Sequence, residues 1–264
     1  MKNKLVAFLW LAIASVSCSS DDDSSGTTAV NYYPLTSGNS WNYEVEGETV
    51  QTDVLTVGDD VTINGKTYKK MLTETTPTGM YCTFLNNNGL RKNDNKVLLS
   101  GAITFDLGLS APFEFQLDDF VILKENATSN ETLATKTGTI DQDFDGIPVT
   151  IDYTLKTVGV ESLPTFTTTR GEVYTDVKKV KFTIALKVVA VITIPGSPIP
   201  LSVTILNTQD VVTANQYYAK EIGMVYAENV ISYNLAINPD DFDLPIPQSA
   251  TQTQKEFLTT YIVN

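Results

Sequence analysis

The chain has 264 residues, with 31 acidic against 18 basic side chains and a formal net charge of −13 at pH 7. A chain this acidic, with no basic patch, repels nucleic acid and anionic lipid headgroups. We therefore expect no nucleic-acid partner. It contains no histidine, which excludes Ser–His and Cys–His nucleophile pairs, imidazole acid–base catalysis and imidazole metal ligands.

The first residues predict an export signal. Lys2 and Lys4 precede the apolar run LVAFLWLAIASVS, which is too short to span a bilayer and is closely followed by acidic residues. Cys18 comes directly after the small or apolar residues 15–17, a setting that suits cleavage and lipidation; the alternative is an ordinary signal with an incidental cysteine. We predict a lipoprotein signal peptide over residues 1–17. Palmitate-type acyl chains on Cys18 would then anchor the protein to a membrane without spanning it.

The segment CSSDDD, residues 18–23, resembles the start of lipoproteins from the Bacteroidota. In that group, acidic residues after the lipidated cysteine are associated with export to the outer face of the outer membrane. The resemblance implies an outer-membrane lipoprotein exposed at the cell surface. Ser15 departs from the Leu or Val that is more usual three places before the cysteine. Residues 18–30 are mainly Ser, Asp, Gly and Thr, a composition typical of a flexible tether.

From residue 31 onward the dominant hydrophobic period is two, which predicts strands. Trp41, Tyr43 and Val45 alternate with polar residues, and Asn64-Gly65 separates two strand-like runs, which favours a hairpin. Residues 178–194 place apolar side chains on one face, and residues 201–212 supply the next strand. We predict one all-β antiparallel domain over residues 31–264, either a cupped half-barrel-like sheet or a β-sandwich. The only helical element expected is a short turn near residues 214–220.

Two further segments resemble uncharacterised Bacteroidota lipoproteins. They are YYPL with GNSWNY, within residues 32–43, and YYAKEIGMV, residues 217–225. In the second segment, Glu221 replaces a glycine of the Ala-Lys-Gly-Val-Gly-Leu-Val pattern, so any tight turn there must differ. The resemblance implies no activity. We interpret both segments as structural, with aromatic side chains alternating into a core.

The clearest candidate for a metal site is DQDFDG, residues 141–146. Asp141, Asp143 and Asp145 alternate before a glycine, and Asp152 falls eleven positions after Asp141, the spacing of a calcium loop. Neither flank is helical, and the segment is interpreted more simply as two strands joined by a turn at Asp145-Gly146. We therefore predict a hairpin, with calcium as the alternative and no other cofactor.

Residues 188–206 carry no charge over nineteen positions, but their central prolines and glycine forbid a continuous membrane helix. We predict a hairpin end that is apolar on both faces. Either another part of the protein covers it, or it forms an exposed lip for a lipid, a partner or the membrane.

Catalytic signals are weak. The pairs Asp118-Asp119 and Asp240-Asp241 are adjacent in sequence, so on a strand their side chains point to opposite faces. With Cys18 lipidated, Cys82 has no disulfide partner, and its apolar neighbours predict a small buried core residue. We predict a non-enzymatic protein that binds a small or apolar ligand. The alternatives are a module that docks to another envelope protein and a hydrolase with two carboxylates.

Overall fold

A single antiparallel sheet of 12 strands makes up the computed structural model, which describes residues 31–105, 112–144, 146–192, 200–239 and 246–264. The predicted signal peptide, the tether with Cys18, Asp145 and the pair Asp240-Asp241 lie outside the described residues. The elements are β1 (Ser40–Glu46), β2 (Val50–Ile63), β3 (Lys66–Thr73), α1 (Met80–Leu85), β4 (Gly89–Asn93), β5 (Lys96–Phe105), β6 (Phe113–Lys124), β7 (Glu131–Phe144), β8 (Ile147–Thr167), β9 (Val173–Ile192), β10 (Leu201–Ala219), β11 (Gly223–Asn234) and β12 (Ser249–Ile262).

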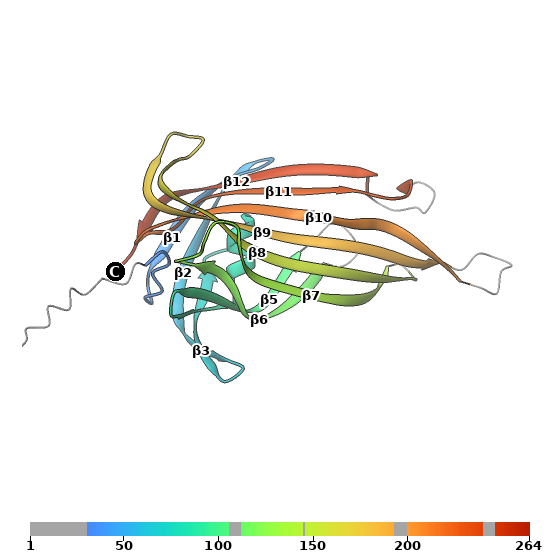
Figure 1. Ribbon diagram of the computed structural model, residues 1–264, viewed down its shortest axis with the longest axis horizontal. Coiled ribbons are helices and arrows are strands. Elements are labelled where there is room, and N and C mark those ends of the chain that lie inside the picture. Colours follow the sequence, from blue (N-terminus) through green and yellow to red (C-terminus); the bar gives the residue numbers. More distant parts are fainter. Residues whose placement is uncertain (1–30, 106–111, 145, 193–199, 240–245) are drawn as a thin grey trace, which may run out of the picture.

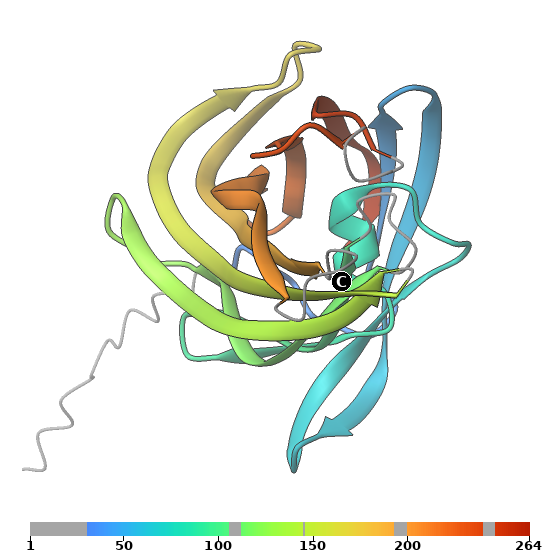
Figure 2. The same ribbon diagram turned by 90° about the vertical axis from the view of Figure 1, so that its right-hand side faces the viewer.

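The order of the strands follows the chain with one long-range pairing. The sheet runs β6-β5-β4-β3-β2-β1-β12-β11-β10-β9-β8-β7, so the first strand pairs with the last, and β6 and β7 form the two edges. Seen along its axis, the sheet curls into a nearly closed barrel shape, and α1 lies inside it (Figure 2). The predicted fold class, an all-β antiparallel sheet, is confirmed, in the form of one curled sheet that is nearly closed (Figure 2).

The two edges overlap instead of pairing. Phe115 of β6 lies 4.8 Å from Tyr153 of β8, and Phe120 lies 6.4 Å edge-on from Phe182 of β9, measured between ring centroids. Strand β6 therefore packs its face against the inner face of β8 and β9. Figure 1 shows that β8 to β10 extend along the long axis of the molecule, while β1, β2 and β3 lie toward one end of it.

The local predictions from hydrophobic period and turn residues are confirmed. Trp41, Tyr43 and Val45 are buried. Asn64 (φ 50°) and Gly65 (φ 75°) join β2 to β3, since a tight hairpin turn requires positive φ at both central residues. Strand β9 covers most of the predicted stretch 178–194.

The predicted helical turn at residues 214–220 is wrong. Strand β10 continues to Ala219, because Tyr218 is buried in the core while Tyr217, on the opposite face of the strand, stacks on Phe166 at 4.0 Å. The tight turn comes afterwards, where Glu221 adopts a φ of 60° in the place of the expected glycine. The helix of the described residues is instead α1, in the segment around Cys82.

The two motifs from opposite ends of the chain pack against each other. The indole N–H of Trp41 donates to the carbonyl of Ile222 (2.6 Å), and the hydroxyl of Tyr43 donates to the carbonyl of Met224 (3.0 Å). Trp41 lies so close to Gly223 that a Cβ there would come within 3.0 Å of Nε1. These contacts hold β1 against the turn before β11, which confirms the structural interpretation of both motifs.

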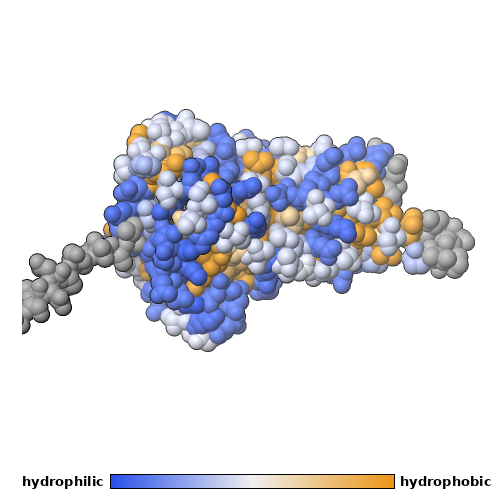
Figure 3. Space-filling model, in the orientation of Figure 1, coloured by the Kyte–Doolittle hydropathy of each residue, from blue (hydrophilic) through white to orange (hydrophobic). Residues whose placement is uncertain are grey.

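The surface seen in Figure 3 is largely hydrophilic, and one of the places where hydrophobic residues gather is the end of the molecule where β9 ends and β8 and β10 begin. Leu201, at the start of β10, is 50% exposed, whereas Val188 is partly buried against the core. The turn of the 188–206 hairpin, residues 193–199, lies outside the described residues. Within the described ranges, no helix is long and apolar enough to cross a bilayer.

Candidate functional site

Helix α1 is held inside the sheet by side chains that point inward from β2 and β12. The first N–H groups of a helix have no partner within the helix. Here Asp53 of β2 accepts hydrogen bonds from the N–H groups of Thr78 (3.0 Å) and Gly79 (2.7 Å). Gln254 of β12 accepts from the N–H of Met80 (2.9 Å). Glu256 of β12 is the third such residue. Together, these three inward-facing side chains accept the hydrogen bonds of the N–H groups at the start of the helix.

Glu256 makes the most enclosed of these contacts. It is fully buried, and Oε1 accepts hydrogen bonds from the N–H of Tyr81 (2.9 Å) and from the side-chain amide of Asn229 (2.8 Å). Burial, and secondarily the nearby charge of Asp53, raises the pKa of Glu256 to about 7. The other carboxylate oxygen, Oε2, and the amide oxygen of Asn229 are buried without a hydrogen-bond partner.

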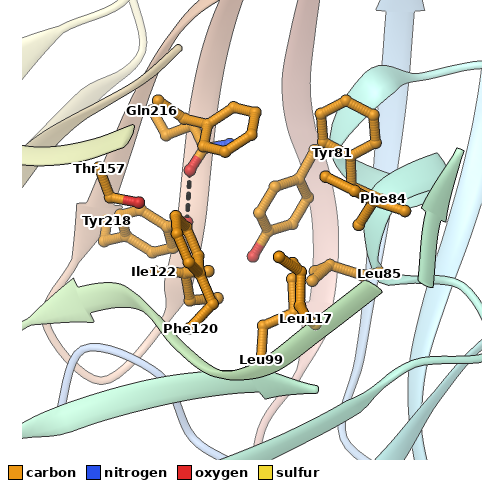
Figure 4. Close-up of a pocket in the computed structure, with 12 residues that line it drawn as sticks. Tyr81, Phe84, Leu85, Leu99, Leu117, Phe120, Ile122, Thr157, Gln216 and Tyr218 are labelled. Atoms are coloured by element: carbon orange, nitrogen blue, oxygen red, sulfur yellow. Dashed lines mark hydrogen bonds between the residues drawn. The ribbon is translucent and has the colours of Figure 1, made fainter. Parts of the chain in front are cut away.

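A small apolar cavity lies in the middle of the molecule, between α1 and the walls formed by β5, β6 and β8 to β10 (Figure 4). Its volume is about 30 Å³, which is room for about one or two water molecules. The hydroxyl of Tyr218 donates to Gln216 (2.7 Å) on its wall, and the hydroxyl of Thr157 is buried there without a partner. This cavity is too small to hold an acyl chain.

A larger and more polar pocket lies on the other side of α1. Its volume is about 240 Å³, and its wall is built by α1, Thr78 before it, and the strands β5, β11 and β12. Apolar side chains, among them Phe84, Phe105 and Ile231, form part of the wall, and none of the described residues that line it is charged. The lining residues that carry a hydroxyl or amide group are Thr78, Thr83, Thr104, Asn229, Gln252 and Gln254.

The calcium candidates lie on the hairpin that the sequence favoured. Asp141 and Asp143 are on β7 and Asp152 is on β8, all exposed. Each accepts a hydrogen bond from within the hairpin: Asp141 from Thr150 (2.8 Å), Asp152 from Thr139 (2.9 Å) and Asp143 from the N–H of Gly146 (2.6 Å). No group of three or more His, Cys, Asp or Glu that could hold a metal occurs among the described residues, which omit Asp145.

The remaining candidates are structural in their contacts. Cys82 is fully buried on α1, as predicted. Asp119, at a positive φ of 49°, receives hydrogen bonds from Arg91 (2.7 and 2.6 Å), Lys66 (2.5 Å) and Tyr68 (2.6 Å). Its neighbour Asp118 is largely exposed and lies 3.9 Å from the same Lys66 ammonium group, so the two carboxylates meet at one cation, and both are engaged in ion pairs.

Sequence reasoning missed the carboxyl pair of Asp53 and Glu256. A signal is present, because Asp53 shares the inward parity of Leu55 and Val57 on β2. On β12, Gln252, Gln254 and Glu256 share one face of the strand in the same way. The signal is a polar residue at a strand position whose neighbours two residues away are buried. Local sequence does not show, however, that residues 53 and 256 lie close together.

Comparison with known proteins gives little further information. No family model matches the chain, and no curated protein matches it. Among solved structures, the chain is similar to a crystal structure of a protein described as a "putative lipoprotein" from Parabacteroides distasonis. The sequence identity is 11%, the TM-score is 0.37, and the match covers 89% of this chain and 99% of the other. The assignment of the motifs in residues 32–43 and 217–225 to a family stays a prediction.

Proposed function

We propose that the protein is a lipoprotein that is anchored to the outer membrane through Cys18 and binds a small neutral ligand in the polar pocket beside α1. Anchoring is supported by the sequence alone: a short apolar signal, a cysteine and an acidic tether. Surface exposure is supported by the resemblance of residues 18–23. Binding is supported by the geometry of the pocket.

The observation that carries the binding proposal is the composition of the pocket wall. Six of the residues that line about 240 Å³ carry hydroxyl or amide side chains and the others are apolar, and none of the described lining residues is charged. Ligand sites combine an apolar wall with a few polar groups that fix orientation. A wall of this kind suits a ligand that carries hydroxyl or amide groups and no net charge, such as a monosaccharide.

The pocket also refines the expectation of an apolar ligand. The apolar cavity, at about 30 Å³, has no room for a lipid tail, whereas the larger pocket offers hydrogen-bond partners. Asn229 links this wall to the carboxyl group of Glu256, because its side-chain amide donates to Oε1 (2.8 Å).

The experiment is native mass spectrometry on the lipoprotein extracted gently from its own membrane. Three forms are compared: the wild type, Gln252→Phe, which places a ring on the face of β12 that carries Gln254 and Glu256 and borders the pocket, and Thr251→Phe, which places the same ring on the opposite, exposed face of β12. We expect the wild type and Thr251→Phe to carry the same small added mass, and Gln252→Phe to lack it. A wild type without added mass that also fails to bind a panel of neutral monosaccharides contradicts the proposal.

Docking to another envelope protein is a second candidate function. Val50 and Val173 are each 62% exposed. They lie at the tips of the β1–β2 and β8–β9 hairpins, which are joined through Arg170 and Glu46 at 2.6 Å. Crosslinking of the membrane-anchored wild type and of the double variant Val50→Ser/Val173→Ser tests it. A crosslinked partner that is lost in the double variant supports docking, and identical crosslinks in both forms contradict docking through these tips.

A further inference from the structure

Two buried carboxyl groups meet beneath the start of α1 without a cation. Asp53 is 2% exposed and Glu256 is fully buried. Among the described residues, neither forms an ion pair with a lysine or arginine. Placing two unpaired negative charges together inside a protein is strongly unfavourable, and the usual outcome is that one group takes up a proton.

The described side chains around Glu256 supply no positive charge that would offset the two carboxyl groups. The titratable side chains that face Glu256 are Asp53 from β2, Tyr43 from β1, Cys82 from α1 and Tyr218 from β10. Burial raises the pKa of the thiol and of both phenols, so these groups remain neutral near pH 7. The side chain that faces Glu256 from β11 is the uncharged amide of Asn229.

The geometry shows where a proton fits. Oε1 of Glu256 already accepts two hydrogen bonds, whereas Oε2 has no partner. A Cβ atom at position 79 would overlap the Glu256 carboxylate and lie 3.0 Å from Oδ2 of Asp53. The two carboxyl groups therefore border the same space above Gly79. If Oε2 carries a hydrogen, this otherwise unpartnered oxygen becomes a hydrogen-bond donor on the side that faces Asp53.

We propose that Glu256 carries a proton at Oε2, beside the carboxyl group of Asp53, and that the loss of this proton loosens α1 from the inside of the sheet. Both carboxyl groups hold N–H groups at the start of the helix, so repulsion between them acts directly on α1. The raised pKa of Glu256, about 7, places the release near neutral pH. Because α1 also forms one wall of the polar pocket, opening of the helix would change that pocket, whether or not the proposed ligand binds there.

The test measures the opening of α1 through the buried thiol of Cys82. In the full chain carrying Cys18→Ser, which serves as the parent, Cys82 is the only cysteine, and a thiol reagent reaches it only when α1 opens. The variant Glu256→Gln, made in this parent, keeps the shape of the protonated side chain and cannot ionise. At each pH the labelling rate of the parent is divided by that of Glu256→Gln, which cancels the intrinsic pH dependence of the thiol.

We expect the parent to be labelled faster than Glu256→Gln by a factor that rises about tenfold per pH unit between about pH 5 and 7, then levels off. Glu228→Gln, a change on the neighbouring strand β11, should behave like the parent. A ratio that stays constant from about pH 5 to 8 overturns the proposal.

Should Glu256→Gln fail to fold, infrared spectroscopy of the parent decides. A carbonyl stretch from a buried protonated carboxyl group is expected at about pH 5.5, where exposed carboxyl groups are ionised, and it should be lost by about pH 8.5. The absence of this band at the lower pH overturns the proposal.

Discussion

The guanidinium carbon of Arg170 lies 3.8 Å from the ring centroid of Phe257. Arg170 also forms ion pairs with Glu44 and with Glu46 (2.6 Å) on β1. One side chain at the tip of the β8–β9 hairpin thereby holds that tip against both β1 and β12. Aromatic contacts continue this outer layer from Phe257 to Tyr226 (5.0 Å) and on to Phe166 (5.7 Å).

These contacts predict the effect of replacing Arg170. Lysine keeps the charge but loses the planar stacking and the forked hydrogen bonds, so Arg170→Lys should lower the free energy of unfolding by about 1 kcal/mol. Denaturant unfolding measures the change. Lys156→Arg, at an exposed position of the same hairpin, is the control and should be neutral. Equal stability of Arg170→Lys and the wild type contradicts the stabilising role of Arg170.

Gly79 should not tolerate a side chain. Its φ of −74° would suit alanine, but a Cβ would overlap the Glu256 carboxylate. We expect Gly79→Ala to lower the free energy of unfolding by about 2 kcal/mol, the usual effect of overpacking. Gly47→Ala is the matched control, because nothing lies within 4 Å of its Cβ position. Urea denaturation of both variants gives the comparison, and similar midpoints would show that the space above Gly79 is not restricted.

Asp119 should stabilise the fold at neutral pH and lose that role in acid. Hydrogen bonds from Arg91, and next from Lys66, hold the pKa of Asp119 well below its usual value. A lowered pKa contributes stability above the unfolded value of 3.8, and this contribution is lost as the pH falls toward the folded pKa. Asp119→Asn should therefore lower the free energy of unfolding by about 2 kcal/mol at pH 7.

The pH dependence and a neighbouring variant check this prediction. The difference between the wild type and Asp119→Asn should shrink as the pH falls below about 4. Asp118→Asn should have little effect, because the Asp118 side chain is 56% exposed. A difference for Asp119→Asn that does not depend on pH would assign the effect to lost packing instead.

Glu256 should produce the opposite trend. Its pKa is raised from 4.5 to about 7, so between these values the folded protein holds a proton that the unfolded chain has released. The free energy of unfolding should fall as the pH rises through this interval, by about 3 kcal/mol in total, and then remain level. Thermal or urea unfolding at several pH values measures the slope. Glu256→Gln should lack it, and an identical slope in that variant would assign the pH dependence to other groups.

Cys18 should decide where the protein is found. Without a lipidated cysteine the chain has no acyl anchor, so Cys18→Ala should remove the protein from the outer-membrane fraction, either by release or by retention elsewhere as an uncleaved precursor. Cys82→Ala is the control and should leave fractionation unchanged. Unchanged membrane fractionation of Cys18→Ala contradicts the anchor.

Local sequence patterns determined the class of this fold. Trp41, Tyr43 and Val45 alternate because successive strand residues face opposite sides, and Asn64-Gly65 supplies the positive φ values of a hairpin turn. Both features depend on residues that are close in the chain, so they can be predicted without knowing what lies across from them. The same patterns favoured the hairpin over residues 141–152.

Only the tertiary structure decided how these strands assemble and where the polar groups meet. The segment MYCTFL is too short to show a helical period, and it becomes α1 because Asp53, Gln254 and Glu256 satisfy its first N–H groups. Those side chains come from β2 and β12, which lie side by side with β1 only because the last strand of the chain pairs with the first. Contacts between residues some 200 positions apart leave no local pattern, so the carboxyl pair and the pocket beside it follow from the pairing of the first strand with the last.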